Sequence, residues 1–599
     1  MSVNPIADTA LAAINGTDTN AEDVRQIPAI AMSGSEQSVE SSYQDNSLLR
    51  LIVESGCEVA GLIDECVELH NRRSIDLLSI IESAEFEAIS GHDFFVVQDF
   101  YRHAMPRLSD VPVERMMRCT DALVRKGGGD LMANRPNEAI VEWLRADKTR
   151  ASVVVTEARE GDAVALGHLT FALQAIGDLK IMRELLADEN TRVRLAALTA
   201  ISRTPHSDDG ERGKTVRVVS SLVGAADEDT HRAHIVAALL LPFVQAKATP
   251  TNEALSAARR ATETCGAATV HIAGQVLLAA GGWCPVNLAE VLLDALRHVE
   301  ASSKGTIDLI DVGLCALLKG DCSEAAVKYV DDVVQRDEDP LPIVDFNSFV
   351  RDWVKRRKDL VDRTVALWLA SGKRLLCQSV DALVSEGNLQ GSPFDIDVGK
   401  LGLTPTQQYF MCGKAIGYLF MKPVSAASIL VSTLRTADAG LAEAIKDLLF
   451  DPLLVSYSGT TLEYLEALPK TDPAHAHVAD VLARTREYLD GLNAAAVMRE
   501  LHPSEYQRQL ERIRDANLNR EIRKSAEKHS ILRDIVHKSV LLHGSGSVTF
   551  VESASGERRP VHMKLHAYSA TGEWPRMETV DPVGLDVVLR TLRAGQLKA

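Results

Sequence analysis

The chain has 599 residues, enough for about four domains of ordinary size or for one elongated repeat array. Hydrophobic residues make up 46% and charged residues 25%, which argues against a disordered, collagen-like or membrane-embedded protein. The 83 acidic and 65 basic residues give a net charge of −18, which disfavours nucleic-acid binding except where positive charge is locally concentrated. Aromatic residues account for only 5%, so we expect a core of aliphatic side chains packed between helices.

The cysteines and the start of the chain indicate a reducing compartment. There are nine cysteines and no C-x-x-C motif, so we expect neither a disulfide framework nor a zinc ribbon. No Lys or Arg precedes Arg25, and no window approaches the ~18 apolar residues that a membrane span needs. These features predict a cytoplasmic protein without a Sec-type signal, membrane contact, cofactor or metal.

Residues 1–45 differ in composition from the rest of the chain. They are rich in small polar residues and carry seven acidic residues against the single Arg25. This composition predicts a disordered acidic tail, and it also fits a secretion address of a translocated bacterial protein.

From residue 46 to about 541, apolar residues recur at spacings of three and four between Gly, Pro, Asp or Asn. This pattern predicts a succession of helices. In one example, Asp162 provides a side-chain cap for a helix over 163–176, and Gly177 ends it. We expect one helical array over 46–498 and no strand before residue 546.

A short acidic motif recurs within this array. The segments 188–191 (DENT) and 227–230 (DEDT) are near copies 39 residues apart, and 147–150 (DKTR) is a looser copy. Each copy precedes an apolar helix. A two-helix unit of about forty residues cannot bury its apolar face alone, so neighbouring units are expected to stack.

The sequence around the central copy resembles a HEAT repeat, which typically has an Asp in the turn between its two helices and an Arg in the second helix. The resemblance covers 178–203 and, in part, 227–245. It implies an all-α solenoid in which Asp188 and Arg194 are ladder residues between adjacent repeats. The alternative is an irregular all-α domain that contains one HEAT-like hairpin.

Residues 499–599 form a third region, with a net charge of +4 against −22 for the preceding residues. We expect a long helix over 504–541, a β-hairpin with strands over 547–552 and 560–568, and a short helix over 582–594. The predicted fold class is therefore an all-α HEAT-like array with a small C-terminal α+β module.

Two sets of residues in this module are candidate contacts for a protein partner or a nucleic acid. The long helix carries cations that alternate with carboxylates, a pattern also typical of a water-exposed face: Arg508, Arg512, Arg520, Arg523 and Lys524. The second strand places four polar residues on one face, which is equally typical of a half-solvated strand: His562, Lys564, His566 and Tyr568. The two histidines are ~13 Å apart on a strand, so they cannot share a metal.

Two other motifs favour structural interpretations. The segment 213–215 (GKT) resembles the end of a phosphate-binding loop, but the first glycine of that motif is replaced by Asp208. We expect an inter-helix loop there. Cys57, Cys66 and His70 have metal-ligand chemistry, but helical geometry places Cys57 on the opposite side, and we expect buried cysteines in an apolar stripe.

Three functions remain open from the sequence. The first is a non-enzymatic scaffold or adaptor that binds a protein partner through an extended helical surface. The second is a nucleic-acid-associated subunit of a larger complex that uses residues 499–599. The third is an enzyme whose residues converge only in space. The sequence defines neither the partner nor the oligomeric state.

Overall fold

The computed structural model contains helices almost throughout the residues it describes. These are residues 39–55, 60–128, 135–384, 391–498, 503–528, 546–552, 558–564 and 572–597. The chain divides into two compact units, Met1–Arg357 and Lys358–Ala599, and each is described by itself.

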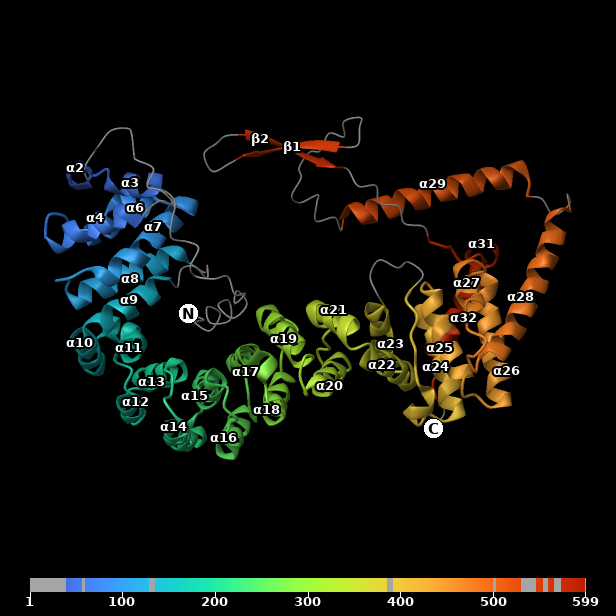
Figure 1. Cartoon of the computed structure of the whole chain (residues 1–599), viewed down its shortest axis with the longest axis horizontal. Helices are drawn as coiled ribbons and strands as arrows, with labels where there is room; N and C mark the ends of the chain where they lie inside the picture. The colour runs from blue at the N-terminus through green and yellow to red at the C-terminus, as the bar shows by residue number, and fades with distance from the viewer. Residues whose placement is uncertain are drawn as a thin grey trace. The chain divides into compact units, whose positions relative to one another are not determined.

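In unit 1 most helices form two rows, and successive helices of the first row contact one another (Figure 1). The first row comprises α7 (Gly91–Ala104), α9 (Arg135–Ala146), α11 (Ala163–Ile176), α13 (Thr191–Arg203), α15 (Asp229–Ala246), α17 (Ala267–Ala280), α19 (Lys304–Leu317) and α21 (Asn347–Arg356). The second row comprises α8 (Val113–Gly127), α10 (Lys148–Arg159), α12 (Leu179–Leu185), α14 (Asp209–Leu222), α16 (Asn252–Thr262), α18 (Val286–Leu296) and α20 (Ser323–Val334). Five helices precede them in the described part of unit 1: α2 (Val39–Gln44), α3 (Leu48–Ser55), α4 (Ala60–Asn71), α5 (Leu78–Ile81) and α6 (Ala84–Ala88).

Local sequence signals set the ends of these helices. The carboxylate of Asp162 accepts the backbone N–H groups of Val164 and Ala165, at 3.0 and 2.8 Å, as predicted for the start of α11. Gly177 ends this helix in the left-handed conformation, with φ at 69°, which glycine adopts without steric cost. The core lies between the rows and is mainly aliphatic, with α15 buried along most of its length.

Helices α13, α15 and α17 begin at Thr191, Asp229 and Ala267, 38 residues apart, and hydrogen bonds join neighbouring helix pairs. The indole of Trp143 donates to the carbonyl of Leu108, 35 residues away, at 2.8 Å. Tyr329 Oη donates to the carbonyl of Leu296, 33 residues away, at 3.1 Å. The chain is therefore a helical repeat protein, and its period agrees with the predicted unit of about forty residues.

Unit 2 continues with helix pairs. Its helices are α22 (Lys358–Ser371), α23 (Arg374–Ser379), α24 (Pro405–Leu419), α25 (Pro423–Leu434), α26 (Ala439–Leu448), α27 (Thr460–Glu466), α28 (His475–Ala496), α29 (Glu505–Lys528), α31 (Met577–Val580) and α32 (Pro582–Ala594). Helix α32 has the predicted bounds, and it packs on α24.

Several observed boundaries differ from the predicted ones. Helix α2 lies inside the segment 1–45 that was predicted to be a disordered tail. It is ordered there because Val39 is buried. Residues 1–38 lie outside the described residues. The predicted long helix is described only as α29. Strands β1 (Gly546–Glu552) and β2 (Arg558–Lys564) pair antiparallel, and the last four residues of the predicted second strand, 565–568, lie outside the described residues.

Candidate interaction surfaces

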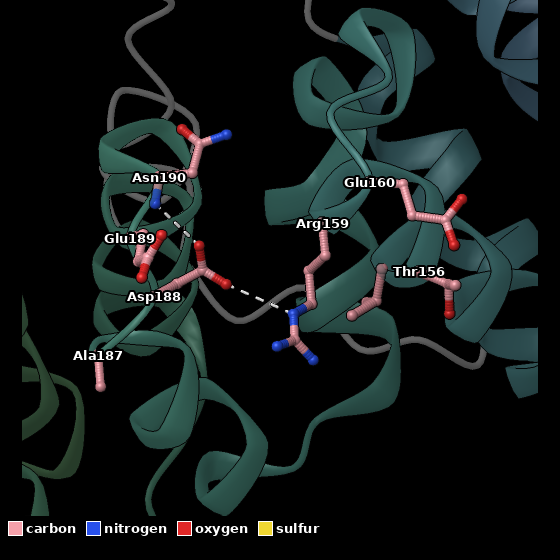
Figure 2. A pocket seen from close by; sticks show the side chains of 8 residues that line it. Thr156, Arg159, Glu160, Ala187, Asp188, Glu189 and Asn190 are labelled. Carbon is pink, nitrogen blue, oxygen red and sulfur yellow. Dashed lines mark hydrogen bonds and ion pairs between the residues drawn. The ribbon is translucent and has the colours of Figure 1, made fainter.

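A groove of about 770 Å³ lies between two neighbouring repeats of unit 1 (Figure 2). One wall is the end of α10, and the other is the turn between α12 and α13. The residues that line it are Val155, Thr156, Arg159, Glu160, Ala187, Asp188, Glu189 and Asn190. Most of these side chains are polar, so the groove offers charged and hydrogen-bonding groups to the surface.

Asp188 joins the two walls of the groove. Its carboxylate lies 3.4 Å from Nε of Arg159 in the preceding repeat, and it also accepts the backbone N–H of Asn190 at 2.9 Å. The side chain of Asp188 is 16% exposed and that of Arg159 is 60% exposed. The ion pair is thus partly solvated, and the guanidinium remains accessible to a ligand.

Arg194, the second predicted ladder residue, stabilises its own repeat instead. Its guanidinium donates to the backbone carbonyls of Asp188 and Glu189 at 2.8 and 2.9 Å. In the next repeat Arg232 makes the equivalent bonds, six and five positions upstream, at 2.9 and 3.0 Å. A helical side chain points back toward the N-terminus of its helix, so these arginines reach their own turn and not the adjacent repeat.

Asp229, which was not among the predicted site residues, forms hydrogen bonds between neighbouring repeats. The carboxylate of Asp229 accepts N–H groups from Gly266 and Ala268, at 2.7 and 2.8 Å, and the hydroxyl of Thr269 at 2.6 Å. Burial opposes ionisation of Asp229, but these hydrogen bonds outweigh it and lower its pKa below the ordinary value. The sequence contains one signal for this contact. Gly266 precedes α17 and has no side chain that could cap the helix, so the acceptor must come from another residue.

Helix α29 carries all the predicted cationic contacts of the long helix, and each described side chain from Glu505 to Ser525 is exposed. At 100° per residue, four arginines fall within an arc of about 120°, the basic face of α29: Arg508, Arg512, Arg520 and Arg523. Lys524 lies at the edge of this face and pairs with Glu521 at 3.0 Å. Glu505 falls in the same arc and pairs with Arg508 at 3.0 Å, so the face carries a net positive charge but is not purely cationic.

The polar residues predicted on the second strand are only partly described. His562 lies in β2 opposite Val548, and Lys564 lies opposite Gly546. His566 and Tyr568 lie outside the described residues. The structure therefore leaves the shared polar face as a prediction.

The segment 213–215 lies inside α14, so the expected inter-helix loop is wrong. Asp208 caps this helix by accepting the backbone N–H of Glu211 at 2.8 Å. Thr215 is buried and bonds to Nε2 of His206 at 3.0 Å. These residues have structural roles.

The predicted role of the cysteines as core residues applies to Cys66, which is fully buried. Nδ1 of the nearby His70 accepts the backbone N–H of Leu77 at 3.2 Å. Cys57 lies outside the described residues. Burial raises the pKa of the Cys66 thiol to about 12, which keeps it protonated near neutral pH.

Comparisons with known proteins identify no family. No family model matches the chain, and no curated protein matches it. Among solved structures, an engineered protein is similar at 15% identity and a TM-score of 0.23, covering 66% of this chain and 97% of its own. A circular tandem repeat protein with a novel repeat topology is similar at 13% identity and a TM-score of 0.15, covering 76% of this chain and 96% of its own. Scores this low support no argument, so the class of helical repeat proteins rests on the stacking described above.

None of the helices in the described part of the chain is both long enough and apolar enough to cross a membrane.

Proposed function

We propose that the chain is a non-enzymatic scaffold or adaptor of the HEAT type, whose repeat surface binds a protein partner. The observation that carries the proposal is the groove between α10 and the α12–α13 turn. Two successive repeats supply its walls, so its shape depends on how the repeats stack and not on any single helix. Stacked helix pairs offer extended surfaces of this kind for binding other proteins.

The chemistry of the groove suits recognition of a partner. Thr156, Arg159 and Glu160 are exposed on one wall, and Glu189 is exposed on the other. Exposed polar groups of both charges can match complementary side chains and so determine specificity and orientation. We further propose the cytoplasm as its location, which is supported by the eight described cysteines, all of them free thiols.

The test is affinity purification of the full chain at native expression levels, with the double variant Glu160→Lys/Glu189→Lys. If a protein partner binds in the groove, its recovery should fall by about tenfold, the effect of losing ~1.4 kcal/mol of binding free energy. Glu184→Lys/Glu263→Lys is a matched control, because it reverses two exposed negative charges outside the groove and changes the net charge by the same amount. Equal recovery from the groove variant and the control would contradict the proposed surface, and substrate turnover by the pure chain would contradict the non-enzymatic role.

The basic face of α29 supports a second candidate function, which is contact with nucleic acid in a larger complex. Its arginines span about 22 Å along the helix axis, so they can contact successive phosphates. Full-length protein with Arg512→Ala/Arg523→Ala should bind DNA or RNA more weakly and with a smaller salt dependence than the unchanged chain. Arg514→Ala is the matched control, because Arg514 lies on the opposite side of the helix. No binding at low salt would exclude this function.

A further inference from the structure

The C-terminal residues 572–597, here called the latch, pack on unit 2 at three points. The carboxylate of Glu573 accepts the backbone N–H groups of Gly459 and Thr460, at 2.7 and 2.9 Å, before α27. Arg576 donates to the carbonyl of Val455 at 2.7 Å. Helix α32 then lies on α24 and buries Leu585.

Two glycines make α24 a close-fitting groove for α32. A Cβ atom at Gly417 would lie 3.2 Å from the backbone nitrogen of Arg593, and one at Gly413 would lie 3.3 Å from Cδ2 of Leu592. These glycines are one helical turn apart, so they lie on the same face. A larger residue at Gly417 would meet the backbone of α32, whereas one at Gly413 would meet only the flexible end of the Leu592 side chain. The groove is therefore shaped for a closely packed helix.

Lys414, between these glycines, recognises the end of the docked helix. It is only 1% exposed, and its ammonium group donates to the carbonyls of Arg593 and Gly595, the latter at 2.7 Å. It also lies 4.8 Å from the ring centre of Phe410. The last carbonyls of a helix lack partners within the helix and carry partial negative charge, so they suit a buried cation. Burial lowers the pKa of Lys414, as expected for a cation whose solvation is replaced by these contacts.

The latch is bound in the manner of a separate ligand. Residues 499–571 connect it to α28, and within them the side chains of α29 are exposed from Glu505 to Ser525. Helix α29 alone is about 36 Å long, so the connection is long compared with the docked helix. The contacts described above are made by residues of the latch itself, and the same contacts are available to the latch of another molecule.

We propose that the α24 groove is a docking site for the C-terminal latch of a second copy of this chain, so that two molecules associate by exchanging latches. When the latch is released, Lys414 loses its carbonyl partners and Leu585 loses its buried environment, so an open molecule gains stability by accepting a latch from another molecule. Exchange competes with docking within one molecule. A connecting chain of this kind gives an effective concentration on the order of 1 mM, so about a tenth of the latches should exchange at ~100 μM protein.

The test uses two full-length chains that carry different tags and one substitution each. The first has Gly413→Cys in the groove, and the second has Leu592→Cys in the latch. A disulfide between these two positions can form only when the latch of one molecule lies in the groove of the other. Under mild oxidation at ~100 μM, we expect a disulfide-linked pair carrying both tags, at about tenfold the yield of the control pair.

The control pair replaces Leu592→Cys with Asp586→Cys, because Asp586 is exposed on the docked latch. A single chain with both Gly413→Cys and Leu592→Cys checks the geometry and should form an intramolecular disulfide. Adding Lys414→Met to the groove chain should reduce the mixed product to the control level. If the doubly substituted chain cross-links within itself while the mixed pair does not exceed the control, the exchange is excluded.

Discussion

Asp229 in unit 1 and Glu573 in unit 2 perform the same chemistry in two different chain contexts. Each carboxylate accepts backbone N–H groups at the start of a helix that is not its own, three for Asp229 and two for Glu573. The partners of Asp229 lie 37, 39 and 40 residues away, in the next repeat, whereas those of Glu573 lie 113 and 114 residues away.

Because of this difference in sequence separation, the loss of each contact should have a different effect on stability. Between repeats, many other contacts of similar sequence separation hold the same helices together, so the loss of one bond leaves the neighbours in place. In the latch, a few anchors hold 26 residues that enter after a long connection. The loss of one anchor therefore shifts an equilibrium between docked and released states, as it would for a bound ligand.

Of the changes predicted here, a fall to acid pH should reduce the stability of unit 1 the most. His234 bonds through Nδ1 to Thr199 Oγ1 at 3.1 Å, between α15 and α13. Burial is the main cause that lowers its pKa from 6.5 to about 4, and the nearby Arg203 and His231 add to this effect. In the unfolded chain this histidine takes up its proton first as the pH falls. Its contribution to stability is therefore complete above pH 6.5 and is lost as the pH falls toward 4.

We expect the free energy of unfolding of unit 1 to fall by about 3 kcal/mol over this range from His234 alone. Hydrogen exchange of α13 and α15 in the full chain, measured at several pH values, would follow the change. His234→Gln keeps a side chain that can bond to Thr199 but does not titrate, so its pH dependence should be shallower. An unchanged slope in this variant would show that other groups cause the acid sensitivity.

Removal of the repeat-to-repeat cap is the next largest effect. Asp229→Ala leaves the start of α17 without its acceptor and should destabilise unit 1 by about 2 kcal/mol. Hydrogen exchange should rise first in α17. Asp227→Ala is the matched control, since Asp227 is an exposed acid in the same turn, and it should change stability little. Equal effects of the two variants would contradict the capping role.

The sequence was sufficient to predict features that depend on local signals, such as the Asp162 cap, the glycine end of α11 and the bounds of α32. It was insufficient where a side chain acts across a repeat, because the DEDT segment gave no sign that its third acid, Asp229, caps a helix 37 residues later. The docking of the latch joins residues up to 181 positions apart. The sequence feature that corresponds to this docking site is Lys414 between Gly413 and Gly417.

Glu573→Ala tests the latch side of the comparison. We expect a loss of about 1.5 kcal/mol in docking, since the start of α27 loses its acceptor. Limited proteolysis between α28 and the latch, followed by gel filtration, should release more of the C-terminal fragment than in the unchanged chain. Hydrogen exchange in unit 1 should remain the same. If unit 1 is destabilised as well, the two regions are energetically coupled and the contrast drawn above fails.

The smallest effect is expected at the ladder residues that the HEAT resemblance suggested. Arg194→Ala removes two bonds to backbone carbonyls within one turn and should destabilise unit 1 by about 1 kcal/mol. Arg159→Ala removes a partly solvated ion pair with Asp188 and should lower stability by only about 0.5 kcal/mol. Urea unfolding monitored by hydrogen exchange in α12 and α13 would rank the two variants. The opposite ranking would mean that the Arg159–Asp188 pair contributes more than the bonds of Arg194 within its own turn.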